Sequence, residues 1–344
     1  MLRLSLTKRI YDTPVIHQKS INGIDLIKFI CAILVFIIHV EPFQGELSGV
    51  RLAMTFGLQH FICRLAVPFY FVCSGFFLFS KQSFHGPDID LVKKYCFKIL
   101  RLIGIWYILL FIGWTGHLWY LRATVVAVVL LTLCFRSHIK YGHICVIAFL
   151  LYITGLLGDS YYGLIAPLKN ITFFNRVIRC YEFAFDTTRN GLFMGFIFVL
   201  IGASLSHCEI KIKPLTAAVG FSISMACLFA EICVLKYFDL PKSYNMYIFM
   251  LPAVYYLFTF AYTVQLKDRP LYKHLRNIGM LVYFTHIATN QIASRTISTL
   301  NQHWDLGLTQ YSFVISLTFT LLVSTGIEYL STKNKFKWLN WLIS

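Results

Sequence analysis

Three ionisable residues of the first apolar segment are spaced so that they share one helical face. Asp25, Lys28 and His39 lie in or beside a run of apolar residues. Ionisable groups are costly at membrane depth and usually face a polar cavity. Lys28 and His39 are 11 residues apart, which is close to three helical turns and a rise of roughly 16 Å. Asp25 lies one turn before Lys28, on nearly the same face.

This spacing is typical of a reaction site with a cation near one end and a base near the other. We predict that His39 is a general base, because histidine titrates close to neutral pH. Lys28 is predicted to hold an anion, and Asp25 to hold Lys28 in place. The alternative is that Lys28 extends to the cytoplasmic interface and that His39 lies among the outer headgroups.

Two further groups of cations follow in the next apolar segments. Arg64 precedes Pro68 near the outer end of the second segment, at a depth comparable to that of His39. It is a candidate for stabilising a developing oxyanion. Lys98 and Arg101 are one helical turn apart at the cytoplasmic start of the third segment. Their spacing alone favours a topology signal, but beside Lys28 they would form a phosphate pocket.

Four other residues are weaker candidates for a site. His117 opens the fourth apolar segment and Arg189 opens the sixth, both at the predicted outer interface. Tyr283 and His286 lie inside the ninth segment, where a histidine is either a packing residue or a functional one. Glu231 also lies within an apolar segment, and the sequence assigns it no role.

The composition indicates a membrane protein. Of the 344 residues, 58% are hydrophobic and only 13% are charged, whereas a soluble protein has about 25% charged residues. The formal net charge is +16, but the basic residues lie in short segments between apolar runs. They therefore indicate membrane topology and contact with anionic lipid, not nucleic acid.

The cysteines and the N-terminal residues exclude several other classes. Most of the ten cysteines lie in apolar runs, without Cys-x-x-Cys or Cys/His ligand spacing. We therefore expect neither a disulfide framework nor a bound metal. Residues 1–20 contain no long apolar core. A cleavable signal peptide is thus not expected, and the first membrane helix would serve as the insertion signal.

The pattern of apolar runs predicts an all-α polytopic membrane protein, folded as one domain over residues 1–344. About ten segments are long enough to span a bilayer, namely residues 22–41, 58–80, 95–115, 117–136, 141–159, 189–206, 214–236, 245–265, 277–296 and 309–331. With both termini inside, 21 of the 31 lysines and arginines, Lys28 included, lie on the cytoplasmic side. This bias predicts N-in, C-in topology. The longest outer loops are then 42–57 and 160–188, and a short link at 113–116 makes segments three and four a hairpin.

The order and spacing of these residues resemble acyltransferase family 3, a family of integral membrane acyltransferases. Its first-helix signature, an Arg or Lys followed by ten residues and a His, is matched by Lys28 and His39. Its second-helix pattern of Arg, Pro-Phe-Phe-Phe and Ser-Gly-Phe is similar to Arg64 followed by the runs 68–71 and 74–76. The resemblance covers nearly the whole chain.

Four other stretches are similar to landmarks of the same family. Its Arg-x-x-Arg pair is matched by Lys98 and Arg101, with lysine in place of the first arginine. The runs at 117–121, 189–193 and 283–286 read His-Leu-Trp-Tyr-Leu, Arg-Asn-Gly-Leu-Phe and Tyr-Phe-Thr-His. The first of them is especially similar to the membrane domain attached to vancomycin-resistance serine racemases. We expect here neither the racemase domain nor the esterase-like domain that some family members carry, so the acceptor stays open.

The resemblance implies transfer of an acyl group, usually acetyl from acetyl-CoA, to a hydroxyl of a glycan or other small extracytoplasmic acceptor. The place of action would be the bacterial cytoplasmic membrane. The CoA phosphates would rest on Lys28, Lys98 and Arg101, while His39 takes the proton of the acceptor hydroxyl. Arg64 would then face the oxyanion.

Two other functions fit part of the pattern. A small-solute transporter, for example for serine, would line its path with Asp25, Lys28, His39 and His286. Inverted repeats would favour a transporter, and we find no convincing internal repeat. A scaffold without chemistry is the third interpretation, but it does not explain why aligned ionisable groups are placed in the first segment.

Overall fold

The computed structural model of the protein describes residues 22–40, 42, 49–80, 82, 87–110, 116–185, 187–304 and 308–343. Over these residues the regular secondary structure is helical and contains no strand. Among them, five helical stretches are long and apolar enough to cross a membrane, namely Asn22–His39, Leu52–Phe79, Gly116–Arg136, Pro214–Tyr237 and Leu308–Ser331. The all-helical, multi-pass class is therefore confirmed. The count of about ten spans and the N-in, C-in orientation stay predictions.

Helices pair their backbone amides within one segment, which is what a membrane span requires. Their order is α2 (Asn22–His39), α3 (Gly49–Gly57), η1 (Leu58–Ile62), η2 (Cys63–Leu65), α4 (Ala66–Phe79), α5 (Ile89–Leu109), η3 (Gly116–Leu118), α6 (Trp119–Arg136), α7 (Tyr141–Leu157), η4 (Tyr162–Leu164), η5 (Ala166–Asn170), α8 (Thr172–Ala184), η6 (Gly191–Gly195), α9 (Phe196–His207), α10 (Pro214–Tyr237), α11 (Met250–Thr263), α12 (Pro270–Trp304), η7 (Leu308–Tyr311), α13 (Ser312–Ser331) and η8 (Asn334–Leu342).

Two predicted loops prove to contain helices. The prediction of a loop at 42–57 is wrong for its second part, because α3 begins at Gly49 and continues into α4 through the η1 and η2 turns. Within the predicted loop 160–188, α8 is a helix with one apolar face. Its polar residues keep it below the hydropathy of a span, so the search for long apolar runs missed it. Of the predicted link 113–116, only Gly116 lies in the part of the chain that the structure describes.

The chain divides into two compact units, which we describe separately. The first unit comprises Pro68–Phe97 and Trp119–Val264 among the described residues, and the second comprises the described parts of Ser20–Val67, Lys98–Leu118 and Gln265–Ser344. The chain passes between the units several times. Each unit is therefore assembled from segments that are distant in the sequence.

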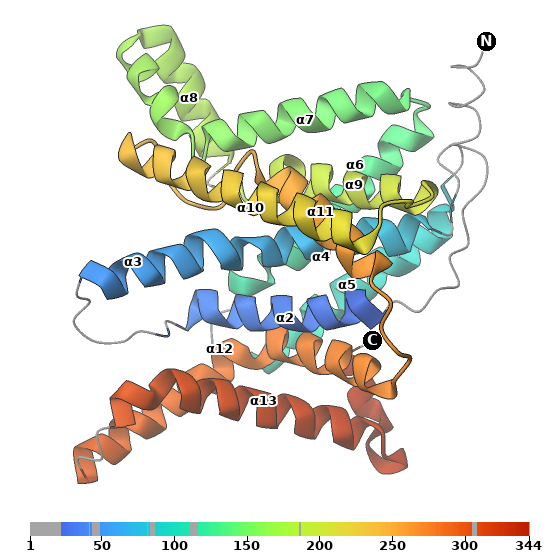
Figure 1. Ribbon diagram of the computed structural model, residues 1–344, viewed down its shortest axis with the longest axis vertical. Coiled ribbons are helices and arrows are strands. Elements are labelled where there is room, and N and C mark those ends of the chain that lie inside the picture. The colour runs from blue at the N-terminus through green and yellow to red at the C-terminus, as the bar shows by residue number, and fades with distance from the viewer. Residues whose placement is uncertain are drawn as a thin grey trace. The chain divides into compact units, whose positions relative to one another are not determined.

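In the second unit, α12 packs against both α2 and α13 (Figure 1). Its core cluster contains Phe36 of α2, Val40 directly after α2, and Val282 of α12, with Phe313 of α13 packed against it. Gly279 lets α12 approach α2 closely, since a Cβ there would lie 3.2 Å from Cα of Phe29. The α2 and α12 helices are thereby held side by side along their length.

The α5 helix is tied to the same unit at its far end. The ring of Trp106 stacks on that of Phe284, with centroids 4.7 Å apart and planes 3° from parallel. Its indole N–H donates to the carbonyl oxygen of Leu342, 3.3 Å away. The apolar ring face of Trp106 thus packs against an aromatic ring, and its buried indole N–H has an acceptor. Trp106 therefore links α5 to both α12 and the C-terminal η8 turn.

In the first unit, α4 and α9 approach each other at two glycines. A Cβ on Gly75 would overlap the carbonyl oxygen of Val199, and a Cβ on Gly202 would overlap that of Val72. Small residues that permit close backbone approach are the usual means of packing helices in a membrane. The α10 and α11 helices pack against each other in the same unit (Figure 1).

Candidate active site

Three histidines meet in the second unit, each from a different element. His39 ends α2, His286 lies in the middle of α12, and His117 is in the short η3 turn. The ring centroids of His39 and His286 are 4.9 Å apart, and those of His117 and His286 are 5.0 Å apart. His286 is therefore next to both of the other rings. The sequence predicted these residues separately, and the structure brings them together.

The backbone sets the tautomer of two of these rings. Nδ1 of His39 lies 2.9 Å from the carbonyl oxygen of Val35, one turn earlier in α2. Nδ1 of His286 lies 2.8 Å from the carbonyl oxygen of Tyr283. A carbonyl oxygen only accepts hydrogen bonds, so each Nδ1 carries a proton, and in the neutral ring each Nε2 carries the lone pair.

The rings of His39 and His286 differ in their exposure to solvent. His286 is completely buried, and its Nε2 has no hydrogen-bond partner among the described residues. His39 is exposed at the end of its helix. A base must reach the proton that it abstracts. Of the two rings, that of His39 is accessible from outside the fold, and His286 lies next to it.

Tyr283 holds the third histidine in place. Its hydroxyl donates to the carbonyl oxygen of His117, 2.7 Å away, and its ring meets that of His117 edge to face, with centroids 5.7 Å apart. Tyr283 and His286 are one turn apart on α12. One helical face thus contacts the η3 turn through a hydrogen bond and a ring.

Arg64 lies in η2, which packs against α2 within the same unit. One of its guanidinium nitrogens, Nη2, lies 3.2 Å from Nδ1 of His60. His60 belongs to the π-helical turn η1 just before it. Such turns are rare and are often found at functional sites. No sequence motif pointed to His60, although it lies one helical turn before Arg64.

Asp25 faces Arg276, a cation that no sequence motif singled out. Its carboxylate oxygen Oδ2 is 3.6 Å from Nη1 of Arg276 in α12, and Lys28 is also close enough to interact with it electrostatically. Asp25 is buried, and a buried carboxylate needs such partners. Asp25 therefore joins α2 to α12 through Arg276, in addition to its predicted proximity to Lys28.

These contacts show that α2 and α12 run in parallel. Asp25 meets Arg276 near the start of the pair, and His39 meets His286 further along. Each helix therefore carries a cation and, about three turns further along, a histidine. The rise from Arg276 to His286 is roughly 15 Å, similar to that from Lys28 to His39.

The predicted phosphate-binding cations belong to the same neighbourhood as Arg276. Lys98 is exposed and interacts electrostatically with both Arg101 and Arg276. The guanidinium of Arg101 lies 5.3 Å from the ring centroid of Trp341 in η8, a cation–π contact. We call Lys28, Lys98, Arg101 and Arg276 the cation cluster. Trp341 was not singled out in the sequence, since nothing local links it to α5.

Arg189 belongs to the first unit, so the structure does not place it relative to the histidines. Its guanidinium lies 4.7 Å from the ring centroid of Trp119, and Nη1 donates to Oδ1 of Asn245 at 3.3 Å. Among the residues that the structure describes, no group of three or more His, Cys, Asp and Glu side chains is placed to hold a metal ion.

Comparison with known proteins identifies the family. The family described as acyltransferase domain, Acyl_transf_3, matches residues 21–329, which include the histidines and the cation cluster. The chain belongs to this family. No solved structure matches it.

The curated relatives of the chain are named racemases, not acyltransferases. An amino-acid racemase of Enterococcus faecalis is 29% identical over 263 residues, which are 70% of this chain and 36% of the relative. A serine/alanine racemase of Enterococcus gallinarum is 27% identical over 348 residues, 92% of this chain and 47% of the relative. The chain thus spans less than half the length of these relatives. The family match and the apolar helices show a multi-pass membrane protein of the acyltransferase family. They do not show which reaction it catalyses.

Proposed function

We propose that the protein is a membrane O-acyltransferase of the bacterial cytoplasmic membrane. It takes an acyl group, in the first instance acetyl, from cytoplasmic acyl-CoA and transfers it to a hydroxyl of a glycan or other small extracytoplasmic acceptor. The observation that supports this best is His39, whose Nδ1 is held by the Val35 carbonyl in the parallel α2–α12 pair.

The cation cluster is the proposed site for the phosphates of CoA. Guanidinium and ammonium groups bind phosphate oxygens strongly, and the cluster gathers cations from α2, α5 and α12. An adenine ring could stack beside Trp341, which already contacts Arg101. The pantetheine arm would then extend along α2, over the roughly 16 Å rise between Lys28 and His39.

In the proposed chemical step, the lone pair on Nε2 of His39 acts as the base while Nδ1 keeps its proton. Nε2 of His39 takes the proton of the acceptor hydroxyl while its oxygen attacks the thioester carbonyl carbon. The tetrahedral oxyanion that forms is stabilised by Arg64. The C–S bond then breaks, the thiolate of CoA leaves and receives the proton from the imidazolium, and the ester is released. His286 keeps the ring of His39 oriented by contact.

The test separates the donor site from the base. Purified protein is titrated with acetyl-CoA by calorimetry, and transfer of labelled acetyl to cell-envelope glycans is then followed. Arg101→Gln should weaken acetyl-CoA binding about tenfold or more, because each charge-assisted hydrogen bond contributes about 1.5–3 kcal/mol. His39→Gln should bind acetyl-CoA normally and lose transfer about 10²- to 10⁴-fold.

The chain offers matched controls for both variants. His303 is exposed on α12, and its Nδ1 lies 2.8 Å from the carbonyl of Thr299, the same local contact that His39 makes. Arg269 is an exposed cation just before α12. His303→Gln and Arg269→Gln should leave transfer and binding unchanged. Full transfer by an inserted His39→Gln protein would disprove the mechanism.

A second function is suggested by the names of the relatives. Because the two relatives are called an amino-acid racemase and a serine/alanine racemase, a transporter for an amino acid such as serine is the competing proposal. It predicts no acetyl-CoA binding by well-folded protein and uptake of labelled serine by proteoliposomes. The calorimetric titration therefore decides which of the two to pursue.

A further inference from the structure

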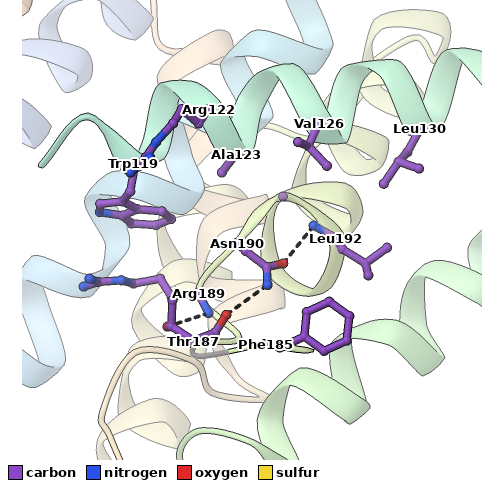
Figure 2. A pocket seen from close by; sticks show the side chains of 11 residues that line it. Trp119, Arg122, Ala123, Val126, Leu130, Phe185, Thr187, Arg189, Asn190 and Leu192 are labelled. Atoms are coloured by element: carbon purple, nitrogen blue, oxygen red, sulfur yellow. Dashed lines mark hydrogen bonds between the residues drawn. The ribbon is translucent and has the colours of Figure 1, made fainter. Parts of the chain in front are cut away.

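The first unit contains a pocket on one face of α6. Its volume is about 590 Å³, and its walls are α6 together with the segment that leads into η6 (Figure 2). Both walls belong to the first unit. The volume is in the range of sites that hold small ligands.

One end of this pocket is cationic. Arg122 and Arg189 both line it, and the guanidinium of Arg189 lies over the ring of Trp119, 4.7 Å from its centroid. Arg122 is exposed. Two guanidinium groups at one end of a cavity are suited to a phosphate group, whose oxygens they can bind in pairs. None of the described lining residues carries a carboxylate.

The rest of the pocket is apolar. Val126 and Leu130 follow Arg122 at intervals of one turn along α6, and Phe185 and Leu192 face them from the other wall. Figure 2 shows Trp119 and Arg189 toward one end, and Leu130 and Leu192 toward the other. The pocket is therefore polarised along the axis of α6.

This polarity matches the depth of α6 in a bilayer. The helix lies in the candidate span Gly116–Arg136, so Trp119 and Arg122 fall in its first turns, at the level where tryptophan and arginine contact headgroups. Leu130 lies eight residues further on, roughly 12 Å deeper toward the hydrocarbon core. An occupant would thus have its charge at the interface and its chain among hydrocarbon.

We propose that this pocket binds one anionic phospholipid of the bilayer. Its phosphate lies between Arg122 and Arg189, and one acyl chain follows Val126 and Leu130. The complementarity of charge favours a phospholipid with a net negative charge over a zwitterionic one, in which a headgroup cation competes with the arginines. The site is independent of acyl transfer and lies on residues that the proposed reaction does not use.

The test is native mass spectrometry of purified, delipidated protein. Phosphatidylglycerol and phosphatidylcholine with identical acyl chains are added in turn, and bound lipid is counted at rising collision energy. The wild type should retain one phosphatidylglycerol and bind it about tenfold or more tightly than phosphatidylcholine. Arg122→Gln and Arg189→Gln should each reduce this preference about tenfold, the loss of one charge-assisted contact.

Two further variants make the result decisive. Arg136→Gln removes an exposed arginine from the other end of the same helix and should keep the preference. Val126→Trp fills the apolar part and should abolish retention of the lipid. Since Arg189 also donates to Asn245, Arg122→Gln decides the matter if Arg189→Gln fails to fold. Equal retention of both lipids by wild type, or an unchanged preference in Arg122→Gln, would overturn the proposal.

Discussion

Glu231 is a carboxylate at membrane depth that organises the backbone of its unit. Its two carboxylate oxygens accept hydrogen bonds from the hydroxyl of Tyr161 at 2.7 Å, from the amide of Ile248 at 2.7 Å and from the amide of Phe249 at 2.9 Å. The two amides come just before α11, so the carboxylate satisfies donors that a helix start leaves without intrahelical partners.

We predict that Glu231→Ala lowers the free energy of unfolding by about 2–4 kcal/mol, because it strands buried donors. Denaturant unfolding in detergent, followed by circular dichroism, measures this change. Glu209 is an exposed carboxylate paired with Lys211, and Glu209→Ala should change stability by less than about 0.5 kcal/mol. If Glu231→Ala is as stable as wild type, these hydrogen bonds make no net contribution to the free energy of unfolding.

Tyr283 is predicted to act on the reaction through the position of His117. Tyr283→Phe removes the hydrogen bond to the His117 carbonyl, worth about 1 kcal/mol, and should lower kcat for acyl transfer about fivefold. The KM for acetyl-CoA should not change, because Tyr283 lies seven residues beyond Arg276 on α12, roughly 10 Å along the helix axis. Steady-state kinetics separates the two constants. Tyr272→Phe, on the same helix, is the control, and a KM effect in Tyr283→Phe would contradict the positioning role.

At the scale of elements, the packing of α4 on α9 depends on residues without side chains. Gly202→Ala is predicted to lower the free energy of unfolding by about 1–3 kcal/mol, since the new methyl group must displace the backbone of Val72. Gly104→Ala, on α5, is the matched change: a Cβ there meets nothing within 4 Å. It should be neutral or slightly stabilising, because alanine is the better helix former. Thermal unfolding of the two variants side by side tests this.

The parallel pairing of α2 and α12 is the element-scale feature that forms the candidate active site. Local periodicity predicted each helix but could not predict which helices pair. The sequence also did not predict where α12 begins and ends. The helix runs from Pro270 to Trp304, beyond the predicted segment 277–296. Hydropathy marks only the apolar part of a helix, whereas its backbone hydrogen bonding continues past that part.

For the whole molecule, the distribution of basic residues predicts which loops face the cytoplasm. Two native cysteines test it, since Cys180 of α8 and Cys208 after α9 are both exposed and fall on opposite predicted sides. With each retained as the single cysteine, a membrane-impermeant maleimide should label Cys180 in intact cells. Cys208 should be labelled only after the membrane is opened. The reverse pattern would invert the predicted topology.

Much of this protein follows from its sequence alone. The low share of charged residues and the long apolar runs determine a helical membrane protein, because a bilayer admits such segments only as hydrogen-bonded helices or closed barrels. The spacing of Lys28 and His39, eleven residues apart, determines that they share a face. Both are local properties of a single segment, so no tertiary information is needed.

Only the tertiary structure decided which of these residues meet. His286 lies next to both His39 and His117. Asp25 faces Arg276, and Glu231 accepts hydrogen bonds from the start of α11. All of these are contacts between segments far apart in the chain. The helix periodicity says which face a side chain occupies, but not which helix packs against that face. Packing is selected by the fit of whole surfaces, down to single glycines such as Gly279 and Gly202, and this fit is a property of the folded chain.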